Sequence, residues 1–202
     1  MCRFVLYASF MATVACSQRS PWVVVPAPQA GESPGHATAA PIDAALIASI
    51  GMLHFPVAGF DGRSLNDSFE DPRDGGARRH HAIDILAPLG TPVLSVQNGR
   101  VLRLSHDPRG GITIYATSPD ERFVFYYAHL DRYHGDLREG QSVARGDTIG
   151  YVGTTGNASQ SVPHLHFQLM RMPPDRKYWN GDPINPYPLL RASSPDTAGK
   201  WR

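Results

Sequence analysis

The chain has 202 residues, which is enough for one well-buried domain with additional terminal segments and too few for two full domains. Hydrophobic residues make up 42% and charged residues 18%, a composition typical of a globular protein rather than a disordered one. The formal net charge of +1 gives no general attraction to polyanions, and the sequence carries no nucleic-acid-binding motif, so nucleic acid is excluded as an expected partner.

The first 16 residues, MCRFVLYASFMATVAC, have the pattern of an export signal. Arg3 precedes an apolar run from Phe4 to Ala15, which is shorter than the roughly 20 residues that cross a bilayer as a helix. Thr13-Val14-Ala15-Cys16 resembles the lipobox of bacterial lipoproteins. We therefore expect residues 1–15 to be a signal peptide and Cys16 to carry a lipid anchor; an ordinary cleaved leader is the alternative.

The remainder divides into three parts. Residues 16–45 are rich in Pro, Ala, Gly and Ser and are expected to form a flexible linker. Residues 46–190 are expected to form one domain, followed by a polar tail at 191–202. Both cysteines, Cys2 and Cys16, precede the domain, so a metal bound there would need His, Asp or Glu ligands.

Hydrophobic periodicity predicts mostly short strands. A helix is expected at residues 42–52, with Ile42, Leu46 and Ile50 on one side. One hairpin is expected around Asn98-Gly99 and a second around Ser118-Pro119-Asp120, because both contain residues typical of tight turns. The expected strands are Thr91–Val96, Val101–Leu104, Ile112–Ala116, Arg122–Leu130, Thr148–Val152 and His164–Met170. This pattern indicates a mainly β domain built on an antiparallel sheet.

The last of these strands, HLHFQLM, carries the most informative polar residues. Alternate side chains of a strand share a face, so His164, His166 and Gln168 point one way and the leucines and Phe167 point the other. The same rule places Tyr127 and His129 together on one face of the Arg122–Leu130 strand. Two imidazoles backed by an apolar face fit a metal or catalytic site.

His80 and Asp84 can share a metal ion only if the chain bends between them. On a straight strand their Cβ atoms would be about 13 Å apart. Metal–ligand bonds are only about 2 Å long. We therefore predict a bend near Ala82 and interpret His81 as a neighbour of the site rather than a ligand.

In this order, the polar motifs resemble those of the lysostaphin-type (LytM-like) zinc metallopeptidases, a family of murein endopeptidases. The matching motifs are His80-x-x-x-Asp84, Tyr127-Ala128-His129-Leu130 and His164-Leu165-His166-Phe167. The resemblance covers about residues 53–188, with supporting fragments at 55–59, 87–93, 98–101, 146–150 and 153–157. Ala82 stands where the family most often has Gly.

The resemblance implies a single antiparallel β domain that forms a groove and binds one Zn²⁺. By position, the zinc ligands would be His80, Asp84 and His166, with His129 and His164 as a second, catalytic pair. Three protein ligands leave a fourth position for water, as in catalytic zinc sites. The sequence has no H-E-x-x-H helix to supply a glutamate base, so the histidine pair is expected to take that role.

Three further residues are candidates for lining a substrate cleft: Tyr127, Thr155 and Asn157. Turn formation and packing are the alternative explanation for each of them.

The implied function is zinc-dependent hydrolysis of stem or cross-link peptide bonds in bacterial peptidoglycan. A non-catalytic activator of other cell-wall hydrolases is the alternative, disfavoured because all five motif positions are filled. The expected location is the periplasmic face of the outer membrane, or the periplasm or exterior without lipidation. The expected partners are peptidoglycan peptides, the membrane through Cys16 and a regulatory adaptor protein.

Overall fold

The computed structural model describes residues 44–193. The signal segment, Cys16 and nearly all of the expected linker lie outside the described residues. The predicted N-terminal helix is present as α1 (Ala44–Ile50), and Leu46 and Ile50 are buried on its inner side, as expected. Ile42 lies outside the described residues. No helix in the described part of the chain is long and apolar enough to cross a membrane.

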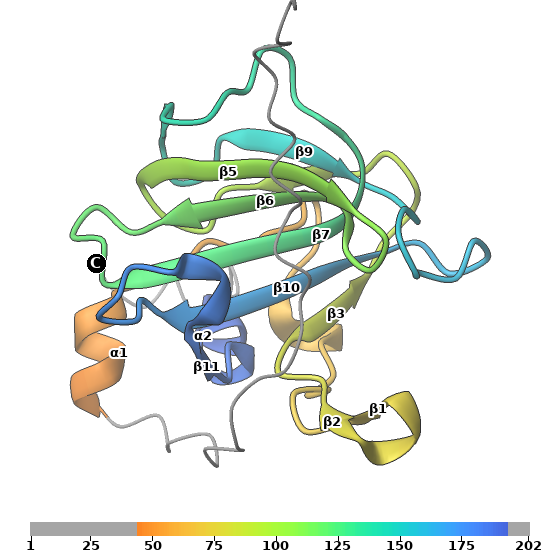
Figure 1. Ribbon diagram of the computed structural model, residues 1–202, viewed down its shortest axis with the longest axis horizontal. Coiled ribbons are helices and arrows are strands. Elements are labelled where there is room, and N and C mark those ends of the chain that lie inside the picture. Colours follow the sequence, from red (N-terminus) through yellow and green to blue (C-terminus); the bar gives the residue numbers. More distant parts are fainter. Residues whose placement is uncertain (1–43, 194–202) are drawn as a thin grey trace, which may run out of the picture. The chain divides into compact units, whose positions relative to one another are not determined.

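The domain is mainly β and antiparallel, which confirms the predicted fold class (Figure 1). Its main sheet follows the order β11-β10-β7-β6-β5-β8, with β3 added beside β10 and β9 beside β7, and with β4 beside β9. The strands are β3 (Ile83–Leu86), β4 (Pro92–Leu94), β5 (Gly99–Asp107), β6 (Gly111–Thr117), β7 (Phe123–Tyr133), β8 (Ser142–Val143), β9 (Thr148–Val152), β10 (His164–Arg171) and β11 (Asp182–Ile184).

Smaller elements lie around this sheet. A separate two-stranded hairpin consists of β1 (Pro72–Arg73) and β2 (Arg78–Arg79), connected by η2 (Asp74–Gly76). The 3-10 helices η1 (Gly62–Ser64) and η3 (Tyr178–Asn180) lie in connecting segments. Helix α2 (Tyr187–Ala192) follows β11. Arg191, which the sequence assigned to the polar tail, belongs to this helix and donates hydrogen bonds to the Gly62 and Arg63 carbonyls.

The long central strands exchange partners along their length. The first part of β7, Phe123–Ala128, pairs with β10, and its last part, from Leu130, pairs with β9. Strand β10 pairs with β3 through residues 164–167 and with β11 through residues 169–171. His129 lies at the exchange point in β7, with a φ of 59° and its N–H donated to the Gly110 carbonyl rather than to a neighbouring strand.

The hairpin predicted at Asn98-Gly99 is wrong. Strand β4 pairs with β9, and β5 pairs with β6 and β8 instead. The Asn98 side chain accepts the Arg145 N–H, and Gly99 lies so close to the Thr117 carbonyl that a Cβ would be 1.9 Å from that oxygen. Asn98 therefore caps a backbone N–H with its side chain, and Gly99 allows two backbone segments to approach closely. Asn and Gly are suited to these roles outside hairpins as well.

The second predicted hairpin is confirmed as β6 and β7, and β9 and β10 match the last two expected strands. In β10 the burial alternates as predicted: Leu165, Phe167 and Leu169 are fully buried, while the histidines face away from the core. The apolar face of β10 thus anchors the strand, and this anchoring fixes where His164 and His166 point.

Candidate metal centre

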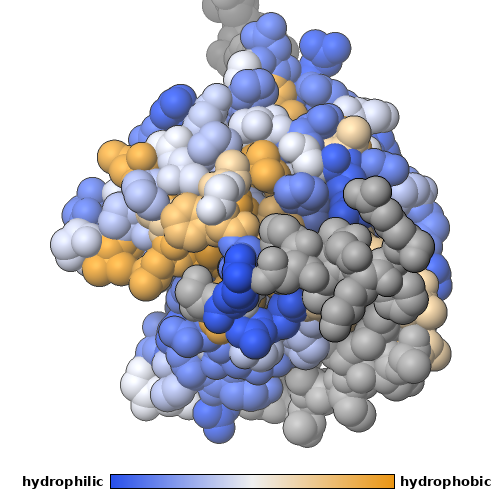
Figure 2. Space-filling model, turned by 180° about the vertical axis from the view of Figure 1, so that it is seen from behind, coloured by the Kyte–Doolittle hydropathy of each residue, from blue (hydrophilic) through white to orange (hydrophobic). Residues whose placement is uncertain are grey.

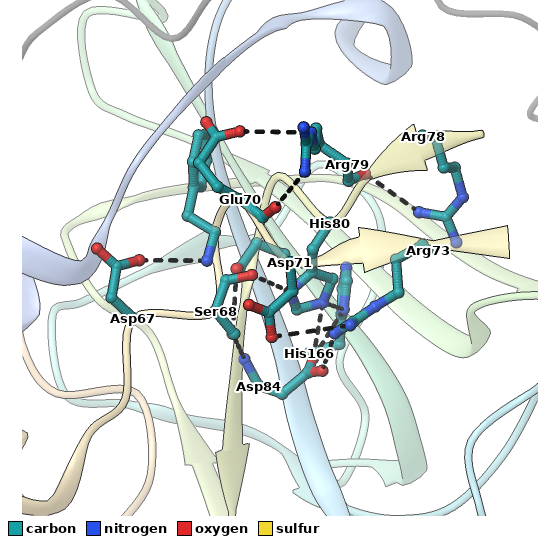
Figure 3. Close-up of polar contacts among 12 residues, drawn as sticks. Asp67, Ser68, Glu70, Asp71, Arg73, Arg78, Arg79, His80, Asp84 and His166 are labelled. Atoms are coloured by element: carbon teal, nitrogen blue, oxygen red, sulfur yellow. Dashed lines mark hydrogen bonds and ion pairs between the residues drawn. The ribbon is translucent and has the colours of Figure 1, made fainter. Parts of the chain in front are cut away.

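The side chains of His80, Asp84 and His166 meet beside the paired strands β3 and β10 (Figure 3). His80 Nε2 lies 3.0 Å from Asp84 Oδ1, His166 Nδ1 lies 3.0 Å from the same oxygen, and the two nitrogens are 3.1 Å apart. Asp84 and His166 are directly opposite each other in the β3–β10 register. The antiparallel pairing of β3 with β10 therefore brings together residues that are far apart in the sequence.

The predicted bend between His80 and Asp84 is present. His81 has a left-handed φ of 57° and Ala82 forms a bend before β3 begins at Ile83. This turn folds His80 back over Asp84 and turns His81 away, so that its ring lies 5.4 Å from the Phe69 ring. His81 is not part of the metal-ligating group.

Hydrogen bonds around the centre fix which nitrogen of His80 faces Asp84. His80 Nδ1 lies 2.9 Å from the Ser68 carbonyl, which can only accept, so Nδ1 carries the proton. In neutral His80 the Nε2 lone pair then points at the Asp84 carboxylate. Two electron-rich atoms at 3.0 Å require a cation, either a proton or a metal ion, to hold them together.

The donor set fits zinc. In a tetrahedral site with bonds of about 2.0–2.1 Å, neighbouring ligand atoms are about 3.3 Å apart. The three atoms of this centre, at 3.0 and 3.1 Å, nearly match that spacing. Burial raises the pKa of the Asp84 carboxyl, but the contacts of its Oδ1 with His166 and His80 outweigh this effect and hold the pKa well below its ordinary value. His80, Asp84 and His166 can therefore hold a metal ion as an anionic three-ligand set.

Two more histidines lie beside this centre. The His129 ring centroid is 5.0 Å from that of His164 and 5.6 Å from that of His166. His129 Nδ1 contacts the Thr155 carbonyl at 2.9 Å, and His164 Nδ1 contacts the Val162 carbonyl at 2.9 Å. Both contacts place the proton on Nδ1 and leave Nε2 with its lone pair free. Burial, aided by the nearby His166, lowers the pKa of His129 to about 4, so this imidazole is neutral at pH 7.

Tyr127 is not a cleft residue. It is fully buried in the hydrophobic core against Phe167, and its hydroxyl accepts the Val96 N–H at 3.1 Å. The predicted shared face with His129 fails because β7 contains a bulge there. Relative to β6, Leu130 pairs with Ile112 and Tyr127 with Ile114, so β7 carries one extra residue and the alternation breaks.

Thr155 and Asn157 form part of the turn beside the histidines. The Thr155 hydroxyl donates to the Leu130 carbonyl and accepts the Ile112 N–H, while its own carbonyl accepts the His129 proton. The Asn157 backbone N–H donates to the Arg109 carbonyl, and its side chain is exposed. Thr155 thus supports His129 directly, and the cleft role of Asn157 stays a prediction.

The edge of the site next to His164 is apolar. Leu86 pairs with His164 in the sheet register and is 62% exposed, and Val162, whose carbonyl contacts His164, is 44% exposed. Figure 2, which views the molecule from the side opposite to Figure 1, shows hydrophobic residues gathered on one part of that face, with hydrophilic residues around them. Exposed apolar side chains beside a polar centre are suited to contacts with the apolar part of a ligand.

Two residues that support the ligands could not be identified from the sequence. Ser68 accepts the His80 ring proton through its carbonyl, and its hydroxyl accepts the Asp84 backbone N–H. Arg73 donates to the second carboxylate oxygen of Asp84 at 2.9 Å. Both belong to a segment with no recognisable motif, so only the folded structure reveals that they lie at the site.

The fold and the site together define a class of protein: an antiparallel β domain with a His/Asp/His metal centre and a second pair of histidines. A family model described as peptidase family M23 matches residues 78–186. The chain therefore belongs to peptidase family M23. All five motif residues lie within the matched region.

Individual relatives agree with this membership. The chain is 33% identical over 149 residues to the L-Ala--D-Glu endopeptidase of Bacillus subtilis (strain 168), covering 71% of this chain and 44% of that protein. The solved structure of lysostaphin, an antimicrobial peptidase from Staphylococcus simulans, aligns with a TM-score of 0.56 and 25% identity over 73% of this chain and 57% of that chain.

A zinc-containing peptidase from Vibrio cholerae aligns with a TM-score of 0.53 and 25% identity over 72% of this chain and 41% of that chain. The chain spans less than half the length of the curated relatives it matches. The likeness therefore concerns the peptidase domain rather than the whole of those proteins.

Proposed function

We propose that this protein is a zinc-dependent endopeptidase that hydrolyses stem or cross-link peptide bonds in bacterial peptidoglycan. One observation carries the proposal: His80, Asp84 and His166 converge within 3.1 Å of one another, next to the unprotonated nitrogens of His129 and His164. A non-catalytic activator would have no need to keep a complete ligand set together with two oriented imidazoles.

Zinc held by the three ligands would polarise a peptide carbonyl and lower the pKa of water toward about 7. The protein's own contribution is orientation. Thr155 fixes the His129 tautomer through its carbonyl, and Val162 does the same for His164, so each ring directs a lone pair toward the centre. Either imidazole can accept the proton of the attacking water at its Nε2, and the imidazolium so formed can donate that hydrogen to the developing oxyanion.

The relatives and the N-terminal pattern support the proposed substrate and location. The Bacillus subtilis relative is an L-Ala--D-Glu endopeptidase, and the chain's own first 16 residues have the export pattern ending at Cys16. We place the domain in the cell envelope, tethered by Cys16 through the Pro- and Ala-rich linker, where it reaches the peptides of the cell wall.

The test combines zinc content with digestion of purified peptidoglycan. The full chain is loaded with Zn²⁺, its bound zinc is quantified, and soluble fragments released from the sacculi are measured. We expect one zinc per chain and fragment release, with both lost in His166→Ala. His106→Ala serves as the control and retains both, because it removes an exposed histidine on β5 that makes no side-chain hydrogen bond, ion pair or ring contact with the five motif residues in the described part of the chain.

Two outcomes separate the alternatives. Zinc binding without fragment release, in the presence of intact peptidoglycan, would favour the activator role. A folded native chain that binds no zinc would contradict the metal centre itself.

A further inference from the structure

Arg73 is the one residue of the β1–β2 hairpin with a polar contact to a predicted metal ligand in the part of the chain that the structure describes (Figure 3). Its Nη2 donates to Asp84 Oδ2 at 2.9 Å, and its Nη1 lies 3.9 Å from the Asp71 carboxylate. The Arg73 side chain is 30% exposed, so part of the guanidinium is shielded from water. A charge-assisted bond of this length in partial shielding is stronger than an exposed ion pair.

The two oxygens of Asp84 have different partners. Oδ1 faces His80 and His166, at 3.0 Å from each, and Oδ2 faces Arg73. A carboxylate bound by a metal through one oxygen needs a donor on the other oxygen to stay in that orientation, and the outer partner also adjusts its charge. Arg73 provides this donor from outside the three-ligand set.

The segment that leads to Arg73 supports the other ligand as well. The Ser68 carbonyl accepts the His80 ring proton, and the Asp71 carbonyl accepts the His80 backbone N–H at 2.9 Å. Residues 68–73 therefore contact both His80 and Asp84, whereas His166 is held by the main sheet. The position of the hairpin is thus linked to the geometry of two of the three ligands.

We propose that Arg73 is a positioning residue for the metal centre: its guanidinium occupies Asp84 Oδ2 and keeps Asp84 a one-oxygen ligand through Oδ1. The proposal rests on the proposed zinc site and goes beyond it by giving a role to a residue outside the ligand and histidine motifs. With Oδ2 occupied, the coordination number stays low and a position remains open for substrate or water.

The chain offers a matched control in the same hairpin. Arg78 donates to Asp74 Oδ2 at 2.6 Å and, among the described residues, makes no hydrogen bond or ion pair with Asp84, His80 or His166. Arg78→Gln therefore removes the same charge from the same hairpin without touching the metal ligands. Differences between Arg73→Gln and Arg78→Gln report on the Asp84 contact rather than on net charge or on loosening of the hairpin.

The experiment uses the full chain in native, Arg73→Gln, Arg73→Met, Arg73→Lys and Arg78→Gln forms. Zinc affinity is measured by competition with a chromophoric chelator, and the visible absorption of the Co²⁺-substituted protein is recorded. Tetrahedral Co²⁺ absorbs more strongly than five- or six-coordinate Co²⁺, so the spectrum reports whether Asp84 binds through one oxygen or two. Neither readout requires peptidase activity.

We expect the zinc Kd of Arg73→Gln to rise about 10- to 100-fold, with a weaker Co²⁺ absorption. The zinc affinity of Arg73→Lys should fall several-fold less than that of Arg73→Gln, because Lys keeps the positive charge without the planar guanidinium. Arg78→Gln should match the native chain.

A native Kd and spectrum in Arg73→Gln would overturn the proposal. Should that variant fail to fold, native values in Arg73→Met, which keeps most of the side-chain length without any donor, would overturn the proposal equally. A native chain that binds no zinc would remove the proposed zinc site together with this role, whereas normal zinc binding by native and Arg73→Gln chains would remove only the role of Arg73.

Discussion

The backbone of His129 decides where its imidazole points. Its left-handed φ of 59° is uncommon for a residue with a side chain and accompanies the bulge in β7. The N–H of His129 bonds to the Gly110 carbonyl and its ring bonds to the Thr155 carbonyl, so two loops hold this conformation. Strain of this kind is typical of functional sites, and here it brings His129 toward His164 and His166.

Thr155 belongs to the support of His129, which leads to a stability prediction. Thr155→Val keeps the shape of the side chain but removes its hydrogen bonds to the Leu130 carbonyl and the Ile112 N–H. We expect the free energy of unfolding to fall by about 1–3 kcal/mol, because both backbone groups lose a partner. Urea denaturation measures the loss.

The adjacent threonine provides the control for this variant. Thr154→Val removes only an exposed contact with Gln160 and should change the unfolding free energy by less than about 0.5 kcal/mol. An unchanged stability of Thr155→Val, combined with a raised KM, would instead show that Thr155 contacts substrate.

Tyr127 gives a second test at the scale of one residue. Tyr127→Phe leaves the buried Val96 N–H without its acceptor, at a cost of about 1–3 kcal/mol of unfolding free energy. Because the ring lies in the core, kcat/KM per folded molecule should stay at the native value. A lower kcat/KM with native stability would instead show that Tyr127 acts on the substrate.

At the scale of elements, strands with regular alternation and the β6–β7 hairpin were predictable from the sequence, whereas the pairings between distant strands were not. The β10 alternation fixed the faces of His164 and His166 because every second residue is a large apolar one. The β4–β9 pairing joins residues more than fifty positions apart, and no local pattern in Thr91–Val96 indicates that partner. The β7 bulge shifted Tyr127 because a local insertion leaves no signal in a hydrophobic pattern.

The site was predictable to a similar degree. The spacing of His80 and Asp84 required a bend, and the bend is present because His81 accepts a left-handed conformation. The supporting contacts of Ser68 and Arg73 depend on a hairpin of two-residue strands, too short to produce a periodic pattern. Their place beside Asp84 follows only from the folded chain.

Gly99→Ala tests the close backbone approach between β5 and β6. In Gly99→Ala the new Cβ would lie 1.9 Å from the Thr117 carbonyl, so β5 and β6 would have to separate. We expect a loss of about 3 kcal/mol or more in thermal or urea unfolding. Gly140→Ala, with a φ of +80° but no atom within 4 Å of its Cβ, should cost only about 1–2 kcal/mol. Equal losses in both variants would contradict the close approach at Gly99.

At the scale of the whole molecule, zinc binding should stabilise the fold because the ligands come from two segments that are together only in the native state. Zinc at 100 times its Kd adds about 2.7 kcal/mol, which corresponds to a rise of about 5–10 °C in Tm for a domain of this size. Differential scanning calorimetry with and without a chelator measures the shift. His166→Ala should show no zinc-dependent shift in Tm. A native chain whose Tm also does not change with zinc would contradict the ligand assignment.

Mass spectrometry of purified peptidoglycan after digestion by the zinc-loaded chain is the decisive test of the proposed peptidase activity. We expect muropeptides cut within the peptide, each product pair gaining one water, and loss of these products in a His129→Ala/His164→Ala variant that still binds zinc. Intact muropeptides after digestion by the native, zinc-loaded chain would contradict the proposal, as would unchanged cutting by the double variant.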